Sequence, residues 1–271
     1  MPSPGKRVTT LDLLEAKRAG RKIVVLTAYD ALFAQLLDES GVDIVLVGDS
    51  VNTVLAGQDT TLSATLEQMI YHTRMVRAGV RRALVIIDMP FLTYQVSIEE
   101  AKRNAGRAMQ LTGAQGVKLE GGLAVRDTVR ALVDIGIPVM GHVGFTPQSV
   151  HALGGSRVQG RGSKAGDRIV ADAKALEDAG VFSVVLELMP SPVAARVTQA
   201  LSIPTIGIGS GPQCDGQVLV LHDMLGLNER FQAKFVKAYA NLGEQVRAAV
   251  KQFAAEVREG RYPDAAHSFD E

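Results

Sequence analysis

The 271-residue sequence contains a single cysteine, Cys214, so the chain cannot form an internal disulfide. One unpaired cysteine is typical of a protein from a reducing compartment. The first 20 residues also lack the apolar segment of a secretory signal peptide. We therefore expect a cytoplasmic protein. Cys214 has no base beside it in the sequence, and we interpret it as a small buried apolar residue.

The sequence also lacks an excess of either charge and any long apolar run. Lys plus Arg and Asp plus Glu each number 29, which gives a formal net charge of zero. Nucleic-acid-binding domains usually carry a basic excess, and a membrane helix needs about 18 or more apolar residues in a row. We therefore predict neither a nucleic-acid partner nor a membrane span. With 46% hydrophobic and 21% charged residues, the composition is that of a folded globular protein.

One pattern recurs along the chain: a helical stretch ends near a glycine, a short β-branched apolar run follows, and a polar residue ends the run. Strands that are apolar throughout are expected in parallel sheets, because both of their faces are buried. Eight such runs begin near residues 22, 44, 83, 117, 138, 183, 204 and 218. Eight strand–helix units in one chain of this length predict an α/β fold, a (β/α)8 TIM barrel formed by residues 1–271 as a single domain.

The last part of the chain, about residues 229–260, is predicted to be helical. The helix is expected to run from Phe231 to about Glu259, with Gly260 as its end. Its apolar residues would either cover the barrel or pack on another subunit, and the sequence leaves both open.

Polar residues end five of the predicted strands, where a barrel carries its active site. A carboxylate at such a position can also be the N-cap of the next helix, and for Asp49 alone the two interpretations are about equal. Capping explains neither the lysine nor the histidine, so we favour an active site for the set. Its members are Asp49, Asp88, Lys118, Glu120, His142 and Glu187.

The types of these residues indicate a chemistry. Asp49, Asp88 and Glu120 offer hard oxygen ligands, which suit Mg²⁺, or Mn²⁺ at similar sites. The alternative is that Lys118 and nearby arginines simply neutralise the three acids. Glu187 could serve as a general base, Lys118 could stabilise negative charge on a substrate oxygen, and His142 could donate a hydrogen bond.

Two glycine-rich loops have no assigned role at this point. Residues 141–166 form a longer connection than an ordinary strand–helix turn, and a lid, an anion site and a surface excursion all remain open. Residues 207–211 (GIGSG) are a weak match to a dinucleotide motif and a better match to a barrel phosphate site.

Five segments stand out when they are taken together and in order: 46–50 (LVGDS), 88–91 (DMPF), 117–121 (VKLEG), 141–149 (GHVGFTPQS) and 206–217 (IGIGSGPQCDGQ). They resemble the ketopantoate hydroxymethyltransferase family, also called 3-methyl-2-oxobutanoate hydroxymethyltransferase. The resemblance runs from about residue 8 to residue 255.

This resemblance implies a barrel enzyme that transfers a hydroxymethyl group from 5,10-methylenetetrahydrofolate to 3-methyl-2-oxobutanoate. The product is 2-dehydropantoate, on the route to pantothenate, and the reaction passes through an enolate stabilised by Mg²⁺. Asp49, Asp88 and Glu120 are the implied metal residues, and Glu187 is the implied catalytic base. The implied substrate-binding residues are Asp49, Ser50, Asp88, Lys118 and His142. Members of the family form homo-oligomers, often decamers.

Three other functions compete with this one. A Mg²⁺-dependent lyase or mutase of the isocitrate lyase and phosphoenolpyruvate mutase type would share the acids, but its usual Lys-Lys-Cys-Gly-His-like segment is absent from the sequence. A phosphosugar barrel would use residues 207–211 and would not need four acids. A non-catalytic scaffold would tolerate loss of those acids.

Overall fold

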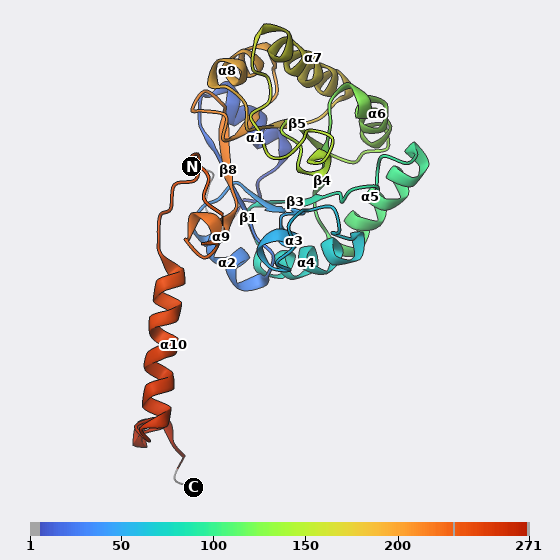
Figure 1. Ribbon diagram of the computed structural model, residues 1–271. Coiled ribbons are helices and arrows are strands. Elements are labelled where there is room, and N and C mark those ends of the chain that lie inside the picture. The colour runs from blue at the N-terminus through green and yellow to red at the C-terminus, as the bar shows by residue number, and fades with distance from the viewer. Residues whose placement is uncertain (1–5, 230, 270–271) are drawn as a thin grey trace. The chain divides into compact units, whose positions relative to one another are not determined.

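A computed structural model describes residues 6–229 and 231–269. Its strands form a closed barrel in which every neighbouring pair is parallel and the order follows the sequence, as predicted (Figure 1). The strands are β1 Ile23–Thr27, β2 Ile44–Val47, β3 Leu84–Asp88, β4 Gly116–Glu120, β5 Val139–Gly144, β6 Ser183–Glu187, β7 Thr205–Ile208 and β8 Gly216–Leu219.

Helices connect the strands and surround the barrel (Figure 1). They are α1 Thr10–Arg18, α2 Ala31–Glu39, α3 Val51–Val54, α4 Leu66–Gly79, α5 Ile98–Thr112, α6 Arg126–Asp134, α7 Ser163–Ala179 and α8 Ser191–Ala200, with short 3-10 turns η1 Leu123–Val125 and η2 Pro147–Ser149. Residues 209–215, all described, join β7 to β8 without a helix. None of the helices in residues 6–229 and 231–269 has both the length and the apolar character to cross a membrane.

The inward side chains at the amino-terminal end of the barrel form an apolar core. Ile23, Ile44 and Leu84, the first inward residues of three neighbouring strands, pack in one cluster with Leu13 of α1, which is fully buried. Burial of a leucine side chain contributes about 1.5–3 kcal/mol to stability. Lys17, also in α1, donates hydrogen bonds to the carbonyls of Thr198 and Ile203. Helix α1 therefore covers this end, and the polar residues occupy the other.

Gly144 occupies a position that other residues fit poorly. Its φ is +97°, and a Cβ atom there would lie 2.2 Å from the carbonyl oxygen of Glu187. Gly136 makes a matched control, because its φ is +87° but a Cβ there meets nothing within 4 Å. We expect Gly136→Ala to cost about 1–2 kcal/mol for the backbone alone, and Gly144→Ala to cost clearly more. Urea unfolding of both variants measures the difference, and equal losses would contradict the predicted clash.

The contacts within the chain divide it into residues 1–220 and Leu221–Glu271, and each part is described by itself. The second part contains α9 Leu221–Met224, α10 Leu242–Arg258 and η3 Ala265–His267. The prediction that the long helix begins at Phe231 was wrong by eleven residues. The backbone N–H groups of Tyr239 and Leu242 donate to the carbonyls of Met224 and Leu225. The segment before α10 therefore bonds back to α9 and the turn after it instead of forming a continuous helix.

Candidate active site

The polar residues singled out in the sequence meet at the carboxyl end of the barrel. In the strand register, Asp88 pairs with Lys118, Glu120 with His142, and Gly144 with Glu187, so the set climbs from strand to strand around the barrel. Five of them are buried: Asp49, Asp88, Lys118, Glu120 and His142. Glu187 differs, because 17% of its side chain is exposed. The sequence therefore predicted both the grouping and its place in the fold.

None of the acids acts as a helix cap. The residue that precedes α3 is Ser50, not Asp49, and it makes no side-chain capping bond. Helix α5, which follows Asp88, has Ser97 as its N-cap, and the Ser97 hydroxyl accepts the capping bond from the backbone N–H of Glu100. The turn after Glu120 has Gly122 at its N-cap position. The capping interpretation of these carboxylates is therefore wrong, and their burial needs another explanation.

Lys118 and Asp88 form a buried ion pair. Lys118 Nζ donates to Asp88 Oδ1 at 2.7 Å and to Oδ2 at 2.8 Å, and it lies 3.9 Å from Glu120 Oε1. Burial lowers the pKa of Lys118, but the charges of Asp88, Glu120 and Asp49 outweigh it and raise the pKa above the usual value. The lysine is therefore held in its charged form among the acids.

Asp49 and Asp88 lie close enough to repel each other. The backbone N–H of Asp49 donates to Asp88 Oδ2 at 3.3 Å. Burial, together with the charges of Asp88 and Glu120, raises the pKa of Asp49 well above its usual value. Burial also raises the pKa of Asp88, although Lys118 opposes the shift. A single lysine therefore does not supply all the positive charge that these carboxylates could use.

His142 lies between two acids. Its Nδ1 is 3.5 Å from Glu120 Oε1 and its Nε2 is 3.1 Å from Glu187 Oε2, but neither nitrogen has the alignment of a hydrogen bond. Burial and the charge of Lys118 lower the pKa of His142, and its two carboxylate partners outweigh them and raise it to about 9. Burial raises the pKa of Glu120, but His142 and Lys118 bring it below its usual value. The ring therefore links the buried Glu120 to the partly exposed Glu187.

Two residues of the site, Gln148 and Tyr94, were not predicted from the sequence. Gln148, in η2, donates from Nε2 to Asp49 Oδ2 at 3.0 Å, and its backbone N–H donates to Glu120 Oε2 at 2.9 Å. Tyr94 OH donates to Gln148 Oε1 at 2.8 Å. Gln148 lies inside the segment 141–149, one of the five that carry the family resemblance, so its place in that segment could have indicated a role in the site. Tyr94 lies in none of the segments.

The two glycine-rich loops turn out differently. The start of the 141–166 loop enters the site through Gln148, and the loop returns to the end of β6, where Gln159 N–H donates to the Leu188 carbonyl at 2.9 Å. In the 207–211 loop, the Ser210 hydroxyl donates to the Leu186 carbonyl at 2.7 Å.

Cys214 is fully buried, as expected, and burial raises the pKa of its thiol. Ser50, expected to bind substrate, has its hydroxyl 2.8 Å from the Tyr29 hydroxyl.

The donor set of the site suits a divalent cation with a preference for oxygen. Among residues 6–229 and 231–269, no three His, Cys, Asp or Glu side chains are already arranged as a metal cage, and Lys118 occupies both oxygens of Asp88. Glu120 Oε1, however, is buried without a hydrogen-bond partner, and burial raises the pKa of both Asp49 and Asp88 even though Lys118 opposes the shift. Hard carboxylate oxygens of this kind fit Mg²⁺ or Mn²⁺.

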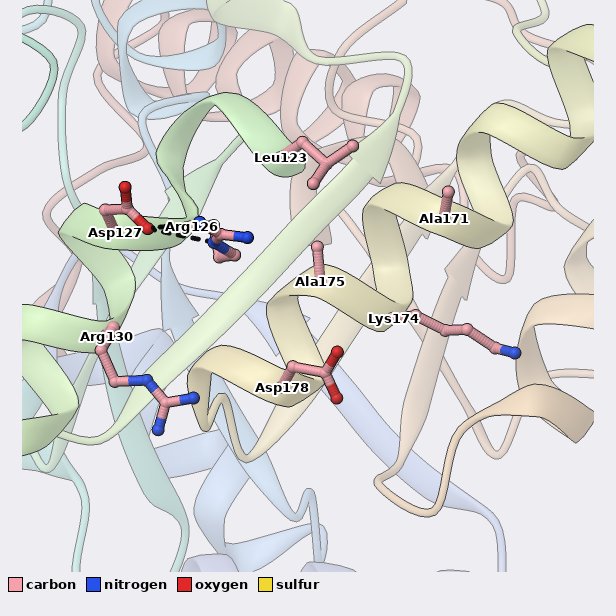
Figure 2. Close-up of a pocket in the computed structure, with 8 residues that line it drawn as sticks. All are labelled: Leu123, Arg126, Asp127, Arg130, Ala171, Lys174, Ala175 and Asp178. Carbon is pink, nitrogen blue, oxygen red and sulfur yellow. Dashed lines mark hydrogen bonds and ion pairs between the residues drawn. The ribbon is translucent and has the colours of Figure 1, made fainter.

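A groove between α6 and α7 lies on the outside of the barrel (Figure 2). Arg126 and Asp127 form an ion pair at 3.0 Å on one side of it, and Lys174 and Asp178 extend from the other. Its charged side chains are all exposed, so water screens their charges from one another. This groove offers none of the buried charge that distinguishes the strand-end cluster.

Comparison with known proteins agrees with the family resemblance found in the sequence. The sequence pattern described as ketopantoate hydroxymethyltransferase matches residues 7–265. The chain belongs to this family. A relative from Syntrophus aciditrophicus (strain SB), named 3-methyl-2-oxobutanoate hydroxymethyltransferase, is 54% identical over 98% of both chains. One from Geobacter metallireducens (strain ATCC 53774 / DSM 7210 / GS-15), with the same name, is 52% identical over 97% of this chain and 99% of its own. The family resemblance read from the five segments is confirmed, and the family is one of enzymes.

Solved structures support the fold. A phosphonopyruvate hydrolase in complex with oxalate and Mg²⁺ has a TM-score of 0.63 at 13% identity and covers 97% of this chain and 92% of its own. A 2,3-dimethylmalate lyase of the phosphoenolpyruvate mutase and isocitrate lyase superfamily has a TM-score of 0.60 at 19% identity, covering 96% and 91%. At these identities the likeness concerns the barrel and not its chemistry, so the lyase and mutase alternative gains only a shared architecture.

Proposed function

We propose that this chain transfers a hydroxymethyl group from 5,10-methylenetetrahydrofolate to 3-methyl-2-oxobutanoate and so forms 2-dehydropantoate. The observation that carries the proposal is the buried group of Asp49, Asp88, Lys118 and Glu120 beside His142 and Glu187, in a chain of this family. Such a site can hold a 2-oxo acid and stabilise negative charge on its keto oxygen, which is what formation of an enolate requires.

Asp49, Asp88 and Glu120 are the residues that would hold Mg²⁺, or Mn²⁺ in its place. When bound, the cation would make the proton at C3 of the 2-oxo acid more acidic by stabilising charge on the neighbouring oxygen. Lys118 adds a second positive charge near the same oxygens, because it is held in its charged form by Asp88. Ser50 and His142 complete the substrate contacts in this proposal.

Glu187 is the proposed base that removes the C3 proton. Its position suits the role, since it lies at the end of β6 next to the buried cluster and remains partly open to solvent. His142 Nε2 lies 3.1 Å from the Glu187 carboxylate, within ion-pair distance, on the side of the cluster. Proton removal by a positioned carboxylate is ordinary general base catalysis.

The test is hydrogen exchange at C3, followed by NMR in D2O. We expect the wild-type protein with Mg²⁺ to replace the C3 proton of 3-methyl-2-oxobutanoate by deuterium, so that the methyl doublet collapses to a singlet. Removal of Mg²⁺ by EDTA should stop the exchange, while omission of the folate should not, because the proton leaves before the one-carbon unit is attacked. A protein that leaves the doublet intact in the presence of Mg²⁺ would contradict the proposed function.

We also propose that the chain acts in the cytoplasm as a homo-oligomer, with the decamer of the family as the expected form. Helix α10 carries four exposed apolar residues at spacings of four, three and four, which places them on one helix face. They are Val246, Val250, Phe253 and Val257. Phe253→Glu should lower the mass measured by light scattering after gel filtration. Gln252→Glu, which adds the same charge beside that face, should leave the mass unchanged, and identical masses for both variants would contradict the proposal.

A further inference from the structure

Gln148 contacts two of the acids at the carboxyl end of the barrel. Its side-chain Nε2 donates to Asp49 Oδ2 at 3.0 Å, and its backbone N–H donates to Glu120 Oε2 at 2.9 Å. The residue is only 4% exposed, so both hydrogen bonds form away from water, where they are stronger. One residue thus binds one oxygen on each of two carboxylates at the ends of different strands.

These bonds leave the second oxygen of each carboxylate for other partners. Glu120 Oε1 is buried without a hydrogen bond; Lys118 Nζ is 3.9 Å and His142 Nδ1 is 3.5 Å away. Among the residues that the structure describes, Gln148 alone hydrogen-bonds the Asp49 carboxylate. Rotation of either carboxylate would therefore break a bond to Gln148, and the direction of the remaining oxygens depends on this residue.

The amide of Gln148 is itself held in one orientation. Its Nε2 makes a second hydrogen bond to the Met89 carbonyl at 2.9 Å. Its Oε1 accepts from Tyr94 OH at 2.8 Å and from Gln95 Nε2 at 3.2 Å. The group thus uses both of its donors and both of its lone pairs. A flipped amide would direct its oxygen at the Met89 carbonyl and the Asp49 carboxylate, so the flip is unfavourable.

We propose that Gln148 is a positioning residue that holds the Asp49 and Glu120 carboxylates with their remaining oxygens toward the cation and the 2-oxo acid. This inference rests on the proposed function. Partners of metal-binding carboxylates typically change metal affinity or activity by about 10- to 100-fold when they are removed. Tyr94 contributes one step further out, through its bonds to Gln148 Oε1 and to the backbone of Glu120.

Gln148→Met tests the role, because methionine keeps the length of the side chain and loses all four amide hydrogen bonds. Gln115→Met is a matched control. Gln115 Oε1 accepts a hydrogen bond from the backbone N–H of Val85, near the amino-terminal end of the barrel. Mn²⁺ affinity is measured by electron paramagnetic resonance with 3-methyl-2-oxobutanoate present and folate absent. We expect Mn²⁺ binding to weaken by about 10- to 100-fold in Gln148→Met and to stay near the wild-type value in Gln115→Met.

A purely structural role would lower the folded fraction and leave the Mn²⁺ affinity of the folded protein unchanged. Tyr94→Phe keeps the test decisive if Gln148→Met does not fold, because it removes one hydroxyl and leaves the bond from Gln148 to Asp49 in place. It should weaken Mn²⁺ binding less than Gln148→Met, yet measurably. Mn²⁺ affinity equal to that of Gln115→Met, in whichever of these two variants folds, would overturn the inference. Failure of the proposed function is separate, since it would appear as absence of C3 exchange in the wild-type protein.

Discussion

Glu187→Gln is expected to reduce C3 proton exchange by about 10²- to 10⁴-fold while the protein still binds 3-methyl-2-oxobutanoate with Mg²⁺. The amide keeps the size of the side chain but cannot accept the proton. The substitution leaves the buried acids and Lys118 in place, and among the described residues the ion-pair contact of the Glu187 carboxylate is with His142 Nε2 at 3.1 Å. NMR in D2O measures the exchange, and calorimetry measures the binding.

Glu177→Gln is the matched control for this prediction. Glu177 lies in α7 and accepts hydrogen bonds from the backbone and hydroxyl of Ser202, on the outside of the barrel. It should lose some stability and keep the wild-type exchange rate. Near wild-type exchange in Glu187→Gln would remove Glu187 as the base and would leave the family assignment intact.

Asp88→Ala is expected to have two large effects at once. Lys118 loses the partner that it bonds at 2.7 and 2.8 Å, and loss of one member of a buried ion pair costs about 3–5 kcal/mol of unfolding free energy. Glu120 Oε1, 3.9 Å from Lys118 Nζ, will offset part of this cost. The same change removes a proposed cation ligand, so Mg²⁺-dependent binding of the 2-oxo acid should weaken by more than about 100-fold, beyond the effect of an outer partner.

Asp43→Ala separates the two effects. Asp43 is also a buried aspartate; it accepts from the backbone N–H of Val24 and from Arg21 at the amino-terminal end of the barrel. Its loss should lower stability, as measured by urea unfolding, without weakening substrate binding. If Asp88→Ala bound substrate with Mg²⁺ as tightly as Asp43→Ala does, Asp88 would not be a cation ligand.

The strands could be predicted because burial on both faces leaves a local mark on the sequence. Residues 44–47 and 84–87 are apolar throughout, and each run precedes an acid, Asp49 or Asp88, that the register then brings to the site. Positions along parallel strands fix which ends meet, so the grouping of the site followed from the order of the strands. The prediction needed no knowledge of side-chain contacts.

Contacts between loops could not be predicted in this way, because they leave no local pattern in the sequence. Tyr94 and Gln148 are 54 positions apart in the sequence, and only the folded loops show that they share a hydrogen bond. The start of α10 was also misjudged, because the apolar residues near Phe231 suit a helix locally. Backbone hydrogen bonds from Tyr239 and Leu242 to the end of α9 and the residue after it decide the conformation there. The spacing of apolar residues in the sequence does not reveal such bonds.

The different exposure of the acids has a consequence for the fate of the proton. Asp88 and Glu120 side chains are 3% exposed, whereas 17% of the Glu187 side chain is in contact with solvent. If Glu187 is the base, as proposed, the proton that it removes can pass directly to bulk water, because part of its side chain contacts solvent. In each catalytic cycle, exchange of this proton with water would then compete with its return to C3 of the 2-oxo acid. The hydrogen at C3 of 3-methyl-2-oxobutanoate would therefore exchange with solvent even when no product is formed.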